Sequence, residues 1–451
     1  MSLLLDLVYL LAFTLGSPWI AYRLFAAGGW RTLPMRLSFG LPAVPRGGIW
    51  LHGSSVGEIS LLRPLIATLE REMPDTPLLI SAFTATGLEA ARSYYPQHPV
   101  IAFPFDFSFV VRRVLRHFDP ELVVVIESDF WPNFLGAVER RGVPSAVLNG
   151  KMSLRSLKLH GRTRVVPAAL RGVDLIAVQS EEHAERIRSL GVPDARLIVT
   201  GNMKYDLAAP STAPQQRERA RRALAYGADE VVVIGASLHA GEGEALLDAF
   251  CAVDPDRHKA ALLLVPRYPA EARSLKEHVS ARGLTAVLKS AVDRGEIAPP
   301  GRAGVLIVDS VGELLRLYAA ADVAFVGGSL FYRGSNKGGH NLMEPAILGL
   351  PILFGPYNFS FKETVQDLLR ADAAIQVQEP AELEGALAAL LEDTPRRRNM
   401  GRKARDVVLA GRGATARNFA LLRDLFGTRA RLQPSSRDRT MPPATSHSDG
   451  Q

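Results

Sequence analysis

The residue types best suited to bind a ligand are concentrated in one glycine-rich stretch, residues 327–344, which reads GGSLFYRGSNKGGHNLME. Its glycines leave room for a ligand beside the backbone, and an apolar helix pattern follows at residues 345–350. A strand, such a loop and a helix N-terminus together favour an anion. Asn341 and Glu344 are three residues apart in the first helical turn, so both can face one ligand, and a glutamate accepts hydrogen bonds from ribose or base groups. The stretch therefore predicts a nucleotide-sugar site, or an ordinary helix start in which Glu344 is a first-turn acid.

Polar residues also end several apolar segments in the N-terminal half. Glu58, Glu127 and Asn149 each lie at or just beyond such an end. In parallel α/β sheets, ligands bind at the carboxyl ends of the strands, so these side chains are candidates for a second half of the site. Glu58 opens a helix pattern, and it is either a catalytic carboxylate or a first-turn acid that stabilises its helix.

The elements that must position these residues alternate between short apolar strands and amphipathic helices, which predicts doubly wound parallel sheets. The segments IWLHGSSVGEISLL and VVVIGASLHAGEGEALL share one order of strand, small residues and Gly-Glu, so Gly57-Glu58 corresponds to Gly241-Glu242. We therefore expect an α/β fold with two Rossmann-like domains facing across a cleft. The expected boundaries are a membrane anchor at 1–30, an acceptor domain at 31–207, a linker at 208–222, a nucleotide-sugar domain at 223–428 and a disordered tail at 429–451.

Composition narrows the partners of this chain. The 451 residues carry a formal net charge of +7, which favours an anionic partner, but no basic motif interleaved with aromatics indicates nucleic acid. The single cysteine, Cys251, excludes an intrachain disulfide and a cysteine metal site, and no other residues have metal-ligand spacing. Residues 3–22 are almost wholly apolar and are followed by arginines, which predicts an uncleaved anchor that either spans the membrane or lies in its interface.

Six short motifs occur in one order along nearly the whole chain: HGSSVGE, ESDFWPN, GNMKYD, VPRYP, DSVGELLRLYAAADVAFVGGSL and GGHNLMEP. Together they resemble the transferases of Kdo (3-deoxy-D-manno-oct-2-ulosonic acid). The resemblance implies a GT-B glycosyltransferase of lipopolysaccharide biosynthesis, inverting and independent of metals or other cofactors. It implies transfer of Kdo from CMP-Kdo to the lipid A precursor, at the cytoplasmic face of the inner membrane.

The resemblance also implies roles for particular residues. Glu58 would be the proton acceptor, and Glu127 and Lys204 would stabilise the transition state. The segments matching the CMP site are Pro266, Arg267, Val311, Gly312, Glu313, Asn341, Leu342, Met343 and Glu344. Three departures are visible: Asp129 stands where the family commonly has glutamate, Val311 replaces a common methionine, and residues 335–337 lengthen the loop after Arg333 and Gly334.

A cationic acceptor face is expected at Lys151, Arg155, Lys158 and Arg162. Their spacing of four, three and four places them on one side of a helix, and no acid lies between Lys151 and Arg164. The proposed acceptor carries phosphates, although a solvated basic face has the same pattern. Two other functions remain open: a membrane-associated GT-B transferase of another nucleotide sugar, and a membrane-tethered nucleotide-binding protein without activity.

Overall fold

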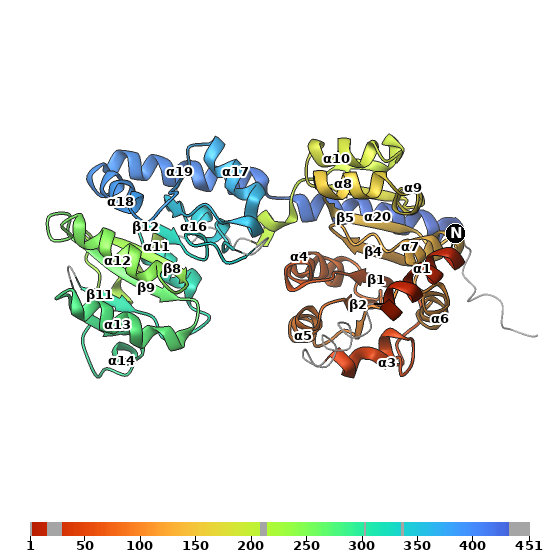
Figure 1. Ribbon diagram of the computed structural model, residues 1–451, viewed down its shortest axis with the longest axis horizontal. Coiled ribbons are helices and arrows are strands. Elements are labelled where there is room, and N and C mark those ends of the chain that lie inside the picture. The colour runs from red at the N-terminus through yellow and green to blue at the C-terminus, as the bar shows by residue number, and fades with distance from the viewer. Residues whose placement is uncertain (1, 16–28, 208–213, 302–303, 335–337, 433–451) are drawn as a thin grey trace, which may run out of the picture. The chain divides into compact units, whose positions relative to one another are not determined.

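The computed structural model describes residues 2–15, 29–207, 214–301, 304–334 and 338–432. These residues form two compact units (Figure 1). The first unit comprises Met1–Leu207 and Arg412–Gln451, and the second comprises Ala208–Gly411.

The first unit is built on a seven-stranded parallel sheet with the order β3-β2-β1-β4-β5-β6-β7. Its strands are β1 (Ile49–His52), β2 (Leu78–Ala82), β3 (Val100–Ala102), β4 (Leu122–Ile126), β5 (Ser145–Gly150), β6 (Leu175–Val178) and β7 (Leu197–Val199). The strand order reverses between β1 and β4, which pair directly, with Ile49 opposite Leu122. A crevice for a ligand is expected at the carboxyl ends of these two strands.

Helices cover both faces of this sheet, which explains its almost uninterrupted apolar strands. All five residues of β4 are buried, and Trp50 of β1 packs against Phe103, Phe118 and Phe134 in one of the two cores. The helical elements of this unit are α1 (Ser2–Leu15), η1 (Gly29–Thr32), α3 (Leu33–Arg36), α4 (Val56–Glu72), α5 (Ala85–Tyr94), α6 (Ser108–Phe118), α7 (Pro132–Arg140), α8 (Leu154–Gly161), α9 (Val165–Arg171), α10 (Glu181–Arg188), η2 (Asp194–Arg196), η3 (Met203–Leu207) and α20 (Ala414–Leu432).

The second unit repeats this architecture, with the strand order β10-β11-β9-β8-β12-β13-β14. Its strands are β8 (Val231–Leu238), β9 (Ala260–Pro266), β10 (Ala286–Leu288), β11 (Val305–Ile307), β12 (Val323–Val326), β13 (Ile352–Phe354) and β14 (Ala374–Gln376). Its helical elements are α11 (Pro214–Ala223), α12 (Glu242–Ala252), η4 (Pro269–Glu271), α13 (Ala272–Ala281), α14 (Lys289–Asp293), α15 (Leu314–Ala320), α16 (Met343–Ile347), η5 (Phe359–Phe361), α17 (Lys362–Arg370), α18 (Glu382–Glu392) and α19 (Thr394–Gly411). Here the order reverses between the paired strands β8 and β12.

The structure divides the chain differently from the expected boundaries at its C-terminal end. The predicted second domain, 223–428, does not include α20 in the structure, because this helix belongs to the first unit, where it is labelled in Figure 1. Apolar side chains of α20, including Leu422, are buried in the core of the first unit, and Asp206 accepts hydrogen bonds from the backbone of Gly413 and Thr415. The expected linker 208–222 contributes most of α11 to the second unit. Residues 429–432 of the expected tail end α20, and 433–451 lie outside the described residues.

The expected anchor, residues 1–30, is described only in part, because residues 16–28 lie outside the described residues. No helix in the described part of the chain is long and apolar enough to cross a membrane. The helix α1 lies against α6 of the first unit, where the Asp6 carboxylate accepts hydrogen bonds from the Ser108 backbone at 2.8 Å and the Asn133 side chain at 2.9 Å. Tyr9 donates a hydrogen bond to Asp106 at 3.1 Å.

Candidate functional site

Glu58 lies at the point where the strand order of the first sheet reverses. It is in the first turn of α4, directly after β1, and Ser55 caps this helix. The Glu58 carboxylate accepts hydrogen bonds from the Ser54 backbone at 2.7 Å and from the Ser55 hydroxyl at 2.9 Å. These two contacts fix the side chain in one orientation at the carboxyl end of the sheet, while Gly57 beside it is exposed.

Asp129 follows the neighbouring strand β4 and faces Glu58. Burial, followed by the charge of Asp129 and a hydrogen bond to its carboxyl group, raises the pKa of Glu58 to about 8. Behind Asp129 lies the fully buried His52, whose Nε2 is 3.6 Å from Oδ2 of Asp129. Burial lowers the pKa of His52 to about 4, so this imidazole is neutral at physiological pH. The helix N-terminus at Glu58 would favour a carboxylate of low basicity, and the structure opposes that tendency by burial and by a like charge.

Glu127, also after β4, is buried between two lysines. It forms an ion pair with Lys151, and its Oε1 lies 3.9 Å from Nζ of Lys204. Asn149 donates a hydrogen bond to the same Oε1 at 3.4 Å and accepts one from the Met203 backbone at 2.8 Å, which links this loop to the segment that carries Lys204. Glu127 and Asn149 have φ values of +62° and +55°, in the left-handed region that non-glycine residues rarely adopt.

The first sheet therefore brings together the three residues for which the resemblance implies catalytic roles, Glu58, Glu127 and Lys204. The Glu58 carboxyl group, with its raised pKa, is suited to accept a proton, and the two ammonium groups beside Glu127 can balance negative charge on a reacting group. The described residues contain no cluster of three or more histidine, cysteine or acidic side chains that could hold a metal ion.

The expected acceptor face is divided by the structure. Lys151 precedes α8 and pairs with Glu127, so it belongs to the carboxylate cluster rather than to the helical face. Arg155 and Lys158 lie in α8, Arg162 ends it, and all three side chains are exposed. The helix α8 has no buried residue and also exposes Leu154 and Leu159, so it offers cations and apolar side chains together.

In the second unit, the segments expected to bind CMP follow the paired strands β9 and β11 and the strand β12, which is separated from β9 by β8. Arg267, after Pro266, is exposed and stacks over Tyr268, with its guanidinium carbon 5.6 Å from the ring centroid. Val311 is 76% exposed and Gly312 has a φ of +88°, so this turn presents backbone groups to solvent. Glu313 is held by Lys289 at 3.0 Å and by the Ser310 hydroxyl at 2.6 Å, and these hydrogen bonds lower its pKa.

Residues 341–344 lead into α16, which begins at Met343. The Asn341 side-chain amide donates a hydrogen bond to Glu344 at 3.1 Å, so the two polar side chains of this turn do face one another. Burial raises the pKa of Glu344. Leu342 and Met343 are buried, so only their backbone groups are available to a ligand.

The correspondence between Glu58 and Glu242 holds in position but not in role. Glu242 is fully buried and accepts hydrogen bonds from the backbone of His239, Gly328, Ser329 and Leu330, at 2.6–2.9 Å. It therefore ties the glycine-rich loop to the end of β8, whereas Glu58 points at other ionisable side chains. The same motif thus supplies the candidate site of the first unit with an acid, Glu58, whereas in the second unit its acid, Glu242, holds two loops together by hydrogen bonds.

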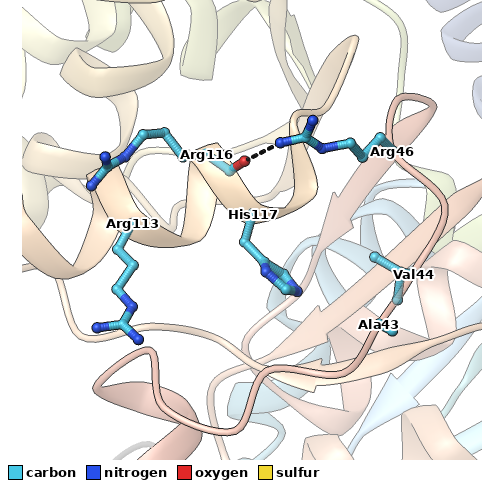
Figure 2. Close-up of a pocket in the computed structure, with 6 residues that line it drawn as sticks. All are labelled: Ala43, Val44, Arg46, Arg113, Arg116 and His117. Carbon is cyan, nitrogen blue, oxygen red and sulfur yellow. Dashed lines mark hydrogen bonds between the residues drawn. The ribbon is translucent and has the colours of Figure 1, made fainter.

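A cationic pocket of about 700 Å³ lies elsewhere on the first unit, between α6 and the segment before β1 (Figure 2). It is lined by Ala43, Val44, Arg46, Arg113, Arg116 and His117. The Arg46 guanidinium donates to the Arg116 carbonyl at 3.2 Å, and His117 turns toward the segment of Ala43 and Val44. None of the three arginines forms an ion pair with a described residue, so the pocket carries uncompensated positive charge.

Sequence reasoning gave no role to Asp129, His52, His239, His340 or Arg333. Asp129 is visible as a carboxylate within ESDFWPN, two residues after Glu127, but its partner Glu58 lies in α4, which follows another strand. His52 ends β1 and His239 follows β8, whereas His340 lies in the glycine-rich loop, so only the first two carry the signal of a strand end.

Comparison with known proteins gives consistent results. Residues 31–207 match the family model described as 3-deoxy-D-manno-octulosonic-acid transferase (kdotransferase). A 3-deoxy-D-manno-octulosonic acid transferase of Haemophilus influenzae is 30% identical over 382 residues, covering 84% of this chain and 87% of the relative. One from Bordetella pertussis is 32% identical over 427 residues, covering 91% and 96%. The crystal structure of UDP-GlcNAc 2-epimerase from Neisseria meningitidis bound to UDP-GlcNAc aligns with a TM-score of 0.55 at 14% identity, covering 84% of this chain and 100% of that chain. That likeness concerns the fold alone, and it agrees with the GT-B class of two parallel-sheet α/β domains.

Proposed function

Because the chain belongs to the family of 3-deoxy-D-manno-octulosonic acid transferases, we propose that it transfers Kdo from CMP-Kdo to a hydroxyl group of the lipid A precursor, with inversion at the anomeric carbon. The observation that carries this proposal is the carboxylate cluster of Glu58, Asp129 and Glu127 at the strand-order reversal of the first sheet. Transfer by a glycosyltransferase requires a proton acceptor for the attacking hydroxyl, and Glu58 is the carboxyl group whose pKa is raised there.

In this mechanism, the acceptor oxygen attacks the anomeric carbon of Kdo as the bond from that carbon to the CMP phosphate oxygen breaks. The hydroxyl proton passes to Glu58, and CMP leaves with the bonding electron pair. Lys204 and Lys151, which flank Glu127, offset negative charge near the reacting groups. We propose that residues of the second unit bind the donor, while Glu58, which belongs to the first unit, accepts the proton.

We propose that α8 binds the lipid acceptor. Its exposed Arg155, Lys158 and Arg162 suit the acceptor's phosphates, and its exposed Leu154 and Leu159 suit the apolar part of a lipid. The solvated-face alternative explains the cations but leaves the two exposed leucines on the same short helix without a role.

We propose that the protein works at the cytoplasmic face of the inner membrane, with α1 lying in the interface. The helix α1 exposes Leu4, Leu7, Val8, Leu10 and Leu11, and Phe109 of the adjacent α6 is also exposed. Arg113 and Arg116 follow Phe109 along α6 at helical spacing, beside Arg46 (Figure 2). Apolar side chains beside cations are the pattern of a helix bound to acidic lipid.

The direct test is incubation of the purified protein with CMP-Kdo and a tetra-acylated lipid A precursor in detergent, followed by mass analysis of the lipid and assay of released CMP. A lipid heavier by Kdo supports the proposal, and nuclear magnetic resonance of the new linkage determines whether the configuration is inverted. Turnover of a uridine or guanosine sugar with no turnover of CMP-Kdo would favour a transferase of another nucleotide sugar. Binding of CMP-Kdo without any turnover would favour the non-enzymatic alternative.

A further inference from the structure

The reversal of strand order in the second sheet has no assigned side chains at its centre. β8 and β12 pair there, and the loops that follow them carry His239 and the glycine-rich stretch 327–344. Ligands of doubly wound sheets bind at this position, in the crevice at the carboxyl ends of the two strands. The residues matched to the CMP site lie around it, after β9, β11 and at the start of α16.

Two histidines from these loops form a stacked pair. The rings of His239 and His340 lie 5.2 Å apart, centroid to centroid, with planes inclined by 10°, and their Nε2 atoms are 3.0 Å apart. Gly328 makes room for them, because a Cβ at this position would lie 2.8 Å from His340 Cδ2. Gly328 also has a φ of +70°, so both the space that His340 occupies and the backbone conformation favour glycine at this position.

Two arginines flank this pair. Burial, followed by the neighbouring His239 and then by Arg267 and Arg333, lowers the pKa of His340 to about 4, and burial and the same two arginines lower the pKa of His239. Arg333 donates to the Ala240 carbonyl at 3.4 Å, and its buried Nε has no hydrogen-bond partner among the described residues. Neither guanidinium forms an ion pair with a described residue.

The Glu242 carboxylate acts electrostatically on His239 and is engaged by the backbone of the two loops. Glu242 is fully buried, and both of its oxygens accept hydrogen bonds from backbone N–H groups of the loops. None of the four cationic or imidazole side chains forms an ion pair with a described acid, and Arg333 Nε is a buried donor without a partner among the described residues. A bound anion would satisfy that donor and would oppose the effects that hold the histidines neutral.

We propose that Arg333 and the His239–His340 pair, together with Arg267, form the site for the ionised group of the donor, the phosphate of CMP or the adjacent sugar carboxylate. This inference rests on the proposed function and adds the residues that recognise the anion. The guanidinium forks suit the oxygens of phosphate or carboxylate, and the histidine pair, whose Nε2 atoms face each other, keeps one Nδ1–H as a further donor. Residues 341–344 and Glu313 remain for the nucleoside.

Calorimetric titration of the full-length protein with CMP, cytidine and CMP-Kdo, without acceptor, tests this inference. Arg333→Ala and His340→Ala should each weaken binding of CMP or of CMP-Kdo by about 10-fold or more, because each removes a charge-assisted contact. Cytidine, which has no ionised group, should bind the variants as it binds the wild type. Arg405→Ala, which removes the same charge from an exposed position of α19, is the matched control and should leave all affinities unchanged.

The ligands distinguish the two anions. Loss of affinity for both CMP and CMP-Kdo places the phosphate at Arg333, and loss for CMP-Kdo alone places the carboxylate there. Arg333→Lys, which keeps the charge without the fork, should fall between the wild type and Arg333→Ala, and it serves as a second variant should His340→Ala fail to fold. Wild-type affinities for CMP and CMP-Kdo in both Arg333→Ala and His340→Ala would overturn the inference. Failure of the wild type to bind CMP or CMP-Kdo would instead overturn the proposed function on which it rests.

Discussion

Glu58 illustrates how one side chain receives its chemistry from two different elements. Its own helix supplies Ser55 and a positive dipole end, both of which favour a carboxylate of low basicity. The neighbouring strand supplies Asp129, and burial adds a second cost to the charged form, so the pKa of Glu58 rises to about 8. The basicity of the proposed proton acceptor thus depends on Asp129, which is 71 positions further along the chain than Glu58.

The first prediction is that Asp129→Asn moves the pH dependence of the reaction to lower pH. The pKa of Glu58 lies above its usual value, so this side chain keeps its proton until the pH rises toward 8, and the basic form increases above that. The value of kcat/KM should therefore rise between about pH 6 and about pH 9. Removal of the Asp129 charge lowers the pKa of Glu58, so the rising limb should shift downward. An unchanged midpoint in Asp129→Asn, at unchanged stability, would show that Asp129 does not act on the proton acceptor.

At this scale, the resemblance indicated Glu58, Glu127 and Lys204, and the structure brings them to one sheet edge. It could not indicate the Glu58–Asp129 contact, because that contact depends on the pairing of β1 with β4 rather than on spacing along the chain. The same reason explains Lys151: helical spacing grouped it with Arg155, but it precedes α8 and pairs with Glu127.

Among the elements, α8 is unusual because none of its residues is buried. The second prediction is that Arg155→Glu combined with Arg162→Glu raises the apparent KM for the lipid acceptor about 10-fold or more while the KM for CMP-Kdo stays nearly unchanged, because reversed charges repel the acceptor's phosphates. Steady-state kinetics with each substrate varied in turn measure both constants. Arg92→Glu, at an exposed position of α5, is the control. Equal changes in both constants would indicate a folding defect instead of an acceptor site.

The helix α1 combines an attached face with an exposed apolar face. Deletion of α1 would remove the Asp6 and Tyr9 hydrogen bonds to α6, α7 and Asp106, so truncation alone would mix folding with membrane binding. The third prediction uses the exposed face only. Leu7→Glu combined with Leu11→Glu should abolish flotation with vesicles of anionic phospholipid and leave the melting temperature unchanged.

Charge reversal at Arg113 and Arg116 should weaken flotation with anionic vesicles more than with neutral ones, since each cation near an acidic surface contributes about 1 kcal/mol. For the variant with Leu7→Glu and Leu11→Glu, the matched control is Leu409→Glu, at an exposed apolar position of α19 in the second unit. Undiminished flotation of the Leu7 and Leu11 variant would place the membrane contact outside α1.

The central strands of both sheets were predictable because buried parallel strands are almost continuously apolar, as LVVVI of β4 shows, whereas the short edge strands β7, β10 and β14 are only partly buried and were not predicted. The place of α20 was not predictable. An amphipathic helix shows which face is buried but not which sheet it covers, and this helix returns to the first unit after 204 residues of the second, from Ala208 to Gly411.

For the whole molecule, the position of α20 means that the first unit consists of two chain segments, one before and one after the second unit. The fourth prediction is that Leu422→Ala, within α20, destabilises the first unit by roughly 2–5 kcal/mol, the cost of a truncated leucine in a core. CMP should still bind, because its proposed residues all belong to the second unit. Calorimetric melting with and without CMP measures both effects, and a loss of CMP affinity equal to that of Arg333→Ala would contradict this division.

The central claim is that this protein transfers Kdo with Glu58 as the proton acceptor, and the measurement that tests it most directly is the single-turnover rate of CMP-Kdo and lipid A precursor with Glu58→Gln. Glutamine keeps the shape of the side chain and removes its basicity. The predicted result is Kdo transfer by the wild type and a rate in the variant that is reduced by about 100-fold or more, with melting temperature and CMP affinity unchanged. A near-normal rate in Glu58→Gln would contradict the assignment of Glu58, and absence of Kdo on the lipid with the wild type would contradict the function itself.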